Sequence, residues 1–100
     1  MPLMPGNIVG YDNLMMVFRF TMMASDARTI ACEVSSKAMD FIARSRGTLP
    51  SERESQFSML RDQIERVASA IFDREGSSVI RIFAKHVEIK KRRRRRQQGA

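Results

Sequence analysis

Residues 51–76 read SERESQFSMLRDQIERVASAIFDREG and carry the most regular pattern in the chain. Apolar side chains recur at intervals of three and four, which predicts an amphipathic helix. These side chains are Phe57, Leu60, Ile64, Val67, Ala68 and Ile71. Ser51 and Glu54 have the spacing of a capping box at its start, and Gly76 suits its end. We expect the apolar side of this helix to pack on a sheet.

Two segments before the helix alternate between one face and the other. In the first, 14–22, the side chains of one face are Met16, Phe18, Phe20 and Met22. In the second, 28–34, they are Ile30, Cys32 and Val34. A period of two is typical of a strand with one buried face. Residues 24–27 read ASDA, where Ser and Asp side chains can bond their own backbone, so the pair predicts a β-hairpin.

A shorter helix and a third strand complete the expected elements. Ser35 or Ser36 can cap a helix over 37–46 that ends at Gly47. The third strand is expected within 77–89. Its predicted faces are Ile80, Ile82 and Ala84 on one side and Val79, Arg81, Phe83 and Lys85 on the other.

The order of these elements predicts an α+β fold, a small β-β-α-α-β domain. We expect a three-stranded, mainly antiparallel sheet with two helices on one face. The pattern leaves open whether the last strand pairs beside the first or the second. Residues 1–12 hold two prolines and two glycines without periodicity and are expected to be a flexible lead-in. The domain itself is expected over 13–89, followed by a disordered basic tail over 90–100.

The net charge of +7 is concentrated near the end of the chain. Seven consecutive cations stand at Lys90, Lys91, Arg92, Arg93, Arg94, Arg95 and Arg96, and the other 11 basic residues balance 11 acidic ones. Cys32 is the only cysteine, so an intrachain disulfide is excluded. The sequence shows neither a signal-peptide pattern nor an apolar run long enough to span a bilayer. We therefore expect a cytoplasmic protein without a transmembrane segment.

Two stretches resemble a family of small bacterial proteins, the domain of unknown function numbered fourteen eighty-eight. They are IACEVSSKAM at 30–39 and FSMLRDQIERVA at 57–68. Family members similarly show a Cys-containing strand that runs into a Ser-capped helix. They also show an Arg and an Ile-Glu pair ahead of a small residue in the long helix. The resemblance extends over about residues 14–85. It implies a small α+β body without an established activity, and it supplies no catalytic residue.

The residue types present do not favour catalysis. His86 is the only histidine, and no Ser or Cys nucleophile stands near it in the sequence. Cys32 lies on a predicted buried face, where a thiol packs as a small apolar group. We expect His86, at a strand end beside charged residues, to be solvated. Because the chain has no Cys/His cluster and no Gly-rich phosphate loop, we expect a non-enzymatic protein without metal or cofactor.

The basic run at 90–96 has the clearest chemical consequence. Adjacent cations repel one another, so the segment is expected to stay disordered until it meets an anionic surface. On nucleic acid the run would release condensed counterions, and arginine forks bind phosphate in a bidentate way. The alternative is a solubilising end that guards the last strand against edge-to-edge pairing.

The outward face of the last strand is a second candidate site. Arg81, Phe83 and Lys85 alternate there, with Arg19 on the same surface. Basic residues around an exposed aromatic ring can clamp and stack single-stranded nucleic acid. The interpretation that we favour is that a second protomer, or the lead-in, covers the apolar residues of this face.

Two functions from different classes follow from these features. In the first, the protein is an accessory nucleic-acid or polyanion binder, in which the tail supplies affinity and Arg81, Phe83 and Lys85 contact bases. In the second, it is a protein-interaction module or homodimer that uses the sheet face or edge, and the tail is only solubilising. A membrane-surface role ranks lower, because the sequence shows no lipidation motif or amphipathic basic helix as a second anchoring signal.

Overall fold

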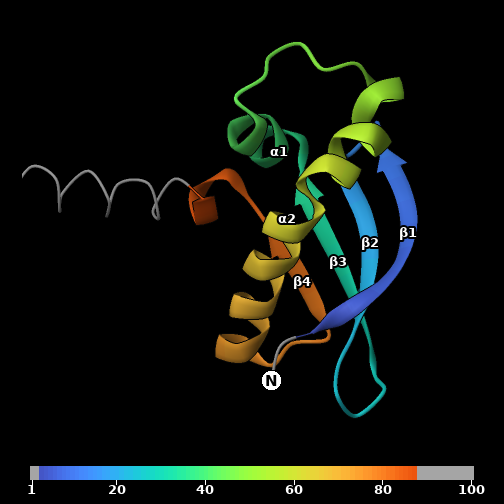
Figure 1. The fold of residues 1–100 in the computed structure, drawn as a ribbon, viewed down its shortest axis with the longest axis vertical. Coiled ribbons are helices and arrows are strands. Elements are labelled where there is room, and N and C mark those ends of the chain that lie inside the picture. Colours follow the sequence, from blue (N-terminus) through green and yellow to red (C-terminus); the bar gives the residue numbers. More distant parts are fainter. Residues whose placement is uncertain (1–2, 88–100) are drawn as a thin grey trace, which may run out of the picture.

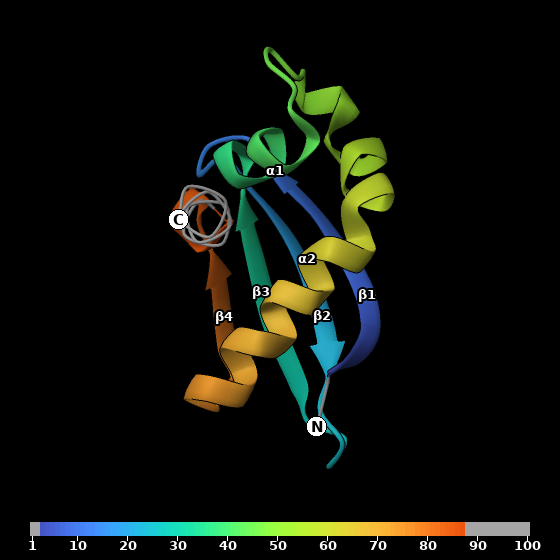
Figure 2. The same ribbon diagram turned by 60° about the vertical axis from the view of Figure 1, so that its left-hand side comes forward.

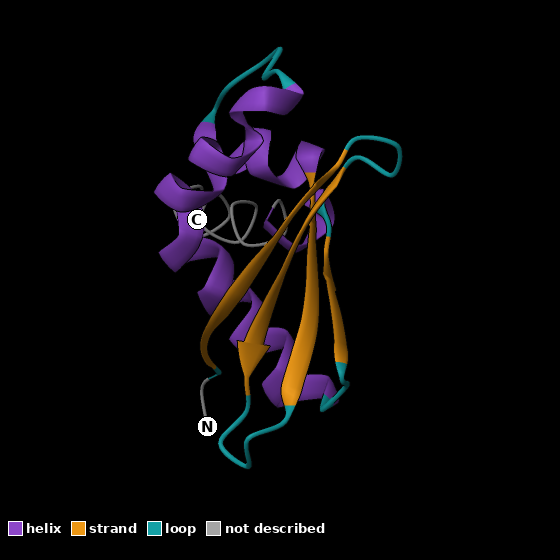
Figure 3. Ribbon diagram, turned by 90° about the vertical axis from the view of Figure 1, so that its right-hand side faces the viewer, coloured by secondary structure: helices purple, strands orange, loops and turns teal. Residues whose placement is uncertain are grey.

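In the computed structural model, which describes residues 3–87, helices cover one face of a four-stranded sheet (Figures 1 and 3). The strands are β1 (Met4–Asp12), β2 (Val17–Met23), β3 (Thr29–Ser35) and β4 (Val79–Ile82). The helices are α1 (Ser36–Ala43) and α2 (Arg53–Glu75), and a short 3₁₀ turn, η1 (Pro50–Glu52), precedes α2. The α+β class and the two helices on one face are confirmed.

The strands lie in the order β1-β2-β3-β4. β2 is antiparallel to both β1 and β3, whereas β4 is parallel to β3. A parallel pair requires a crossover connection, and α1 and α2 provide it. The last strand therefore pairs beside the second strand of the predicted hairpin, in a mainly antiparallel sheet.

The prediction of three strands and a flexible lead-in over 1–12 is wrong, because part of the lead-in forms β1. This strand is irregular, and its register with β2 shifts on both sides of Ile8. Gly6 is needed where the two strands meet, since a Cβ there would lie 2.5 Å from the Thr21 carbonyl oxygen. Because β1 is an edge strand, it tolerates Pro5 and the bulges that hid its periodicity in the sequence.

The predicted buried faces of the hairpin form the core. Their fully buried side chains are Phe18, Phe20, Met22, Ile30, Cys32 and Val34. From α2, the Phe57 ring stacks on Phe18 with centroids 4.5 Å apart and contacts Phe20 at 4.8 Å. Such aromatic pairs stabilise a core by about 0.5–1.5 kcal/mol beyond their buried area. Met16, expected on the same face, lies instead in the β1–β2 turn.

The first helix begins where the sequence predicts and ends earlier. Ser35 caps α1 by accepting a hydrogen bond from the Ala38 N–H at 3.1 Å. The helix ends at Ala43, and Arg44 adopts the left-handed conformation (φ 56°) that was expected at Gly47.

The second helix begins later than predicted and ends at the expected residue. The predicted capping box of Ser51 and Glu54 does not form. Instead, Leu49 donates its N–H to the Glu52 carboxylate at 2.9 Å, and α2 starts after η1. Gly76 ends the helix in the left-handed conformation (φ 65°), as predicted.

A largely buried polar cluster fastens α1 to the start of α2. Arg53 Nη1 donates to Asp40 Oδ1 and to Gln56 Oε1, each at 2.7 Å. Gln56 and Thr48 also donate to Asp40 Oδ1, each at 2.9 Å. The Arg53 guanidinium lies over the Tyr11 ring, 5.5 Å from its centroid, which links the cluster to β1. The crossover is therefore held by charged hydrogen bonds as well as by apolar contacts.

The cluster keeps the Asp40 carboxyl group ionised. Burial by itself raises the pKa of Asp40, but hydrogen bonds from Arg53, Gln56 and Thr48 outweigh it and lower the pKa from 3.8 to about 2. A carboxyl group with a lowered folded-state pKa stabilises the fold above its unfolded pKa. The contribution of Asp40 is therefore lost as the pH falls from about 4 to about 2.

We expect Asp40→Asn to lower the free energy of unfolding by about 2–4 kcal/mol near neutral pH. Arg53 would then stay buried without its counter-charge. Urea denaturation at several pH values measures this, and the difference from the native protein should shrink as the pH approaches 2. Asp62→Asn, at an exposed position of α2, is the control and should change stability by less than roughly 0.5 kcal/mol. A difference that stays constant down to pH 2 would contradict the role given to the Asp40 charge.

Candidate functional site

The outer face of the sheet, opposite the helices, carries a row of alternating charges with one residue from each strand. Arg19 on β2 pairs with Asp12 on β1, and its Nε lies 3.0 Å from Oε2 of Glu33 on β3. Arg81 on β4 lies 3.4 Å from the other oxygen of Glu33. The sheet register places Arg19, Glu33 and Arg81 directly beside one another. Opposite charges that face each other on neighbouring strands stabilise the pairing of those strands.

This row changes the interpretation of Arg81. Its side chain is 64% exposed, but it shares Glu33 with Arg19. Hydrogen bonds to Asp12 and then to Glu33 raise the pKa of Arg19. The Met15 backbone N–H and then Arg19 lower the pKa of Asp12. Because each positive charge of the row faces a negative one, Arg19 and Arg81 do not form a basic platform on the outer face.

Strand β4 is shorter than the predicted strand 77–89. It ends at Ile82, and residues 84–87 form a helical turn; the last two residues of the expected strand lie outside the described part of the chain. Phe83 donates its N–H to His86 Nδ1 at 2.8 Å, and His86 donates its N–H to the Phe83 carbonyl at 3.0 Å. The ring and the backbone of His86 thus both bond to Phe83, and the chain enters a helical turn directly after β4. His86, expected to be solvated, is half-buried.

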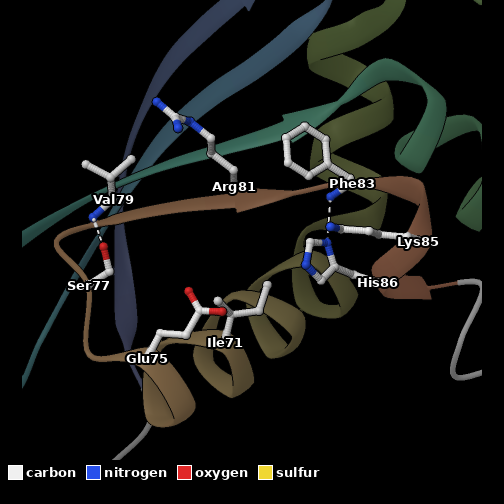
Figure 4. Close-up of a pocket in the computed structure, with 8 residues that line it drawn as sticks. All are labelled: Ile71, Glu75, Ser77, Val79, Arg81, Phe83, Lys85 and His86. Carbon is white, nitrogen blue, oxygen red and sulfur yellow. Dashed lines mark hydrogen bonds between the residues drawn. The ribbon is translucent and has the colours of Figure 1, made fainter.

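The predicted row of Arg81, Phe83 and Lys85 along one strand is therefore not formed. Figure 4 shows the three side chains around a shallow groove beside β4, with a volume of about 490 Å³. The groove is lined by Ile71, Glu75, Ser77, Val79, Arg81, Phe83, Lys85 and His86. Phe83 is 44% exposed, and its ring lies 6.1 Å from the His86 ring. The structure thus gathers the predicted residues at a groove and not on a flat face.

The free edge of β4 is partly blocked by neighbouring side chains. The other edge pairs with β3, where Ala31 donates its N–H to the Ser78 carbonyl at 3.0 Å. On the free edge, Ser77 Oγ accepts the Val79 N–H at 3.2 Å at the start of β4, and His86 Nδ1 accepts the Phe83 N–H just after its end. Donors that are already bonded are not available to an added strand. A second copy that paired along this edge would have to displace both bonds.

The basic run at 90–96 lies outside the described residues, which end three positions before it. Val87, the last described residue, comes directly after the groove residue His86. Three residues span at most about 11 Å when fully extended, so Lys90 lies within that distance of Val87 along any path. Of the predicted nucleic-acid-binding residues, Arg81 lies on β4 and Phe83 and Lys85 follow its C-terminal end directly. The run at 90–96 is joined to the same end through the chain.

The described residues give little support to thiol or metal chemistry. Cys32 on β3 is 1% exposed, and burial raises the pKa of its thiol to about 12. A buried, protonated thiol is a poor nucleophile, and the packing role predicted for Cys32 is confirmed. Within residues 3–87, no group of three or more His, Cys, Asp or Glu side chains is placed to hold a metal ion. No helix in the same range is long and apolar enough to cross a membrane.

The tip of the β1–β2 hairpin is a surface feature that the sequence reasoning missed. Leu14, Met15 and Met16 are 91%, 63% and 57% exposed. Their place at the start of an alternating segment led to the prediction that they belong to a strand. Asp12 Oδ1 accepts the N–H groups of Leu14 and Met15, each at 3.0 Å. Asp12-Asn13 at the start of this segment is the turn signal that could have located the tip.

We expect Cys32 in the folded protein to react with a thiol reagent at least about a thousandfold more slowly than in the denatured chain at mildly alkaline pH. The reason is that the raised pKa leaves almost no thiolate. Stopped-flow or manual labelling with a chromogenic disulfide, with and without denaturant, measures the ratio. Equal rates in the two states would show an accessible, reactive thiol and would reopen thiol chemistry.

Comparisons with known proteins agree with this fold. No curated protein matches the chain. A crystal structure of a protein of unknown function from the DUF1488 family of Shewanella loihica PV-4 is similar, with a TM-score of 0.68 and 18% sequence identity. The similarity covers 80% of this chain and 90% of that chain, and at this identity it shows the fold alone. The sequence pattern described as "Protein of unknown function (DUF1488)" matches residues 10–82, so the chain belongs to the DUF1488 family, as its resemblance predicted.

Proposed function

We propose that this protein is a non-enzymatic binding protein that binds polyanions, and nucleic acid in particular, through its basic C-terminal end. The observation that carries the proposal is the position of the run at 90–96. Seven adjacent cations begin three residues after Val87, and Val87 directly follows His86, which lines a groove together with Arg81 and Lys85. The excess positive charge of the whole chain is thereby tethered to one end of the sheet.

Counterion release supplies the free energy of this binding. Each phosphate that a cation neutralises frees condensed counterions, and the association constant falls with salt by a log–log slope of about −0.9 per phosphate. If all the cations of the run contact phosphates, the slope is about −6. Arginine suits this task because its planar fork binds phosphate oxygens in pairs.

The groove supplies a smaller share of the proposed affinity. Arg81 is engaged with Glu33, and Glu75 adds a negative charge to the groove lining. Lys85 and the Phe83 ring are exposed, and an exposed ring can stack on an unpaired base. We therefore expect the run to dominate binding and the groove to favour single strands modestly.

The alternative function, a protein-interaction or self-associating module, is favoured by the exposed apolar side chains of Val79 and Phe83 in the same groove. A protein partner would cover them. Two observations weigh against a homodimer through the sheet: the outer face carries paired charges, and the free edge of β4 is partly blocked. Polyanion binding is therefore the function that we propose.

We expect the full-length protein to bind labelled single- and double-stranded oligonucleotides with a salt slope near −6, and a variant with all seven cations of 90–96 changed to Gln to lose most of this binding. Fluorescence anisotropy at low and physiological salt measures both. A matched control changes exposed cations elsewhere, Lys37→Gln and Arg74→Gln, and should bind within about twofold of the native protein.

Three outcomes would count against the proposal. Equal binding by the run variant would move the site onto the folded body. Absence of binding by the native protein at low salt would remove nucleic acid as a ligand. A salt-tolerant oligomer that Phe83→Asp dissociates, seen without nucleic-acid binding, would support the interaction module instead.

A further inference from the structure

The groove beside β4 contains a carboxylate, which attraction to polyanions does not explain. Figure 2 shows the last turns of α2 beside β4, the edge strand of the sheet. Glu75, the last residue of α2, lines this groove and is exposed. None of the ion pairs within residues 3–87 includes it. A negative charge at the C-terminal end of a helix opposes the helix dipole, so helix stability gives no reason for a carboxylate here.

The groove has a negative end and a positive end. Figure 4 shows Glu75 and Ser77 at one end and, at the other, the side chains that follow β4. These are Phe83, Lys85 and His86. Phe83 is 44% exposed, and Lys85 is exposed as well. A flat apolar ring therefore lies toward the positive end of the groove, and a carboxylate acceptor lies at the opposite end.

The hydrogen bond that His86 accepts decides which of its ring nitrogens is a donor. Nδ1 accepts the Phe83 N–H at 2.8 Å, so it carries no hydrogen of its own. A neutral imidazole then has its hydrogen on Nε2. Figure 4 shows this second nitrogen turned away from the Phe83 backbone, toward the space that the groove residues surround. The groove thus offers an uncharged donor in addition to the Lys85 ammonium group.

We propose that the groove binds one unpaired nucleotide of a single strand whose base carries an exocyclic amino group, as in cytosine, adenine and guanine. The base would stack on the Phe83 ring, its amino group would donate to Glu75, and Lys85 would contact its phosphate. Uracil and thymine present one donor between two carbonyl oxygens, which a carboxylate repels because it only accepts. The inference rests on the proposed function and adds to it which bases the groove selects.

The size and the polar groups of the groove favour a nucleotide over a segment of protein. Its volume of about 490 Å³ lies in the range of small-ligand sites, about 300–1,000 Å³. An added peptide strand would need backbone donors along the edge of β4, and the N–H groups of Val79 and Phe83 are already bonded. A base needs neither donor, because it binds through its ring face and its polar edge.

The test is a titration of the full-length protein, labelled with nitrogen-15, with cytidine 5′-monophosphate or uridine 5′-monophosphate near neutral pH. Amide NMR follows the binding. The two ligands share the same sugar and phosphate and differ in the base, where cytosine has an amino group and uracil a carbonyl oxygen. Charge attraction to the protein is therefore the same for both, and the ratio of their dissociation constants isolates the contribution of the base.

We expect the cytidine nucleotide to bind about three- to tenfold more tightly than the uridine nucleotide, with the largest chemical-shift changes at Phe83, Lys85 and His86. Glu75→Gln should reduce this ratio to less than about twofold, because an amide both donates and accepts. Phe83→Leu should weaken both nucleotides by at least about threefold through loss of stacking. The matched control is Glu54→Gln, which alters an exposed carboxylate in the first turn of α2 and should leave the ratio unchanged.

Equal binding of the two nucleotides, or an undiminished preference in Glu75→Gln, would overturn the proposal. The same comparison with oligo(dC) and oligo(dT) identifies the source of the nucleotide: a preference among free nucleotides that is absent from the strands would replace the strand by a free nucleotide as the ligand. The proposed function fails separately. Loss of the basic run should leave the cytidine preference intact, so this preference without any oligonucleotide binding by the native protein would reject the proposed function alone.

Discussion

Strand β4 can lie parallel to β3 only if the chain returns from one end of the sheet to the other, and α1 and α2 make this return. The rest of the structure depends on that constraint. The return lays α2 across the hairpin, where Phe57 closes the core against Phe18 and Phe20. It also brings the end of β4 beside the end of β3, at the same end of the sheet as the start of β2, so that residues far apart in the sequence share one end of the sheet.

The polar cluster around Asp40 and Arg53 fixes the middle of this return. A charged group that is mostly withdrawn from water is costly unless it is fully bonded, and Asp40 accepts hydrogen bonds from four side chains, those of Ser45, Thr48, Arg53 and Gln56. The cluster lies at the connection between the helices and contacts β1 through Tyr11. The helices are thereby tied to the sheet by directional bonds, while apolar packing supplies most of the stabilising free energy.

The elements that depend on periodicity were predictable from the sequence, and those that depend on particular tertiary contacts were not. The hairpin, the body of α2 and the burial of Cys32 follow from spacing. β1 was not predicted because its residues follow no regular pattern. Gly6 is required by the close approach of Thr21, and Pro5 is tolerated because β1 is an edge strand. The alternation continues in the sequence beyond Ile82, but the chain turns there, and two hydrogen bonds between Phe83 and His86 hold the turn.

The candidate site was predicted in its residue types and not in its shape. Arg81, Phe83 and Lys85 surround a groove, and Glu33 and Arg19 neutralise the outer face on which a basic platform was expected. The groove lies beside β4, and the described chain ends directly after the groove residue His86, three residues before the basic run.

We propose that ligands bind at the end of the sheet where β4 finishes, and the decisive experiment is amide NMR of the full-length protein during titration with a short oligonucleotide. We expect the largest chemical-shift changes within 81–96, with little change at the opposite end of the sheet around Met23 and Thr29. Changes centred on the opposite end, or on the exposed side of α2 around Met59, would contradict it.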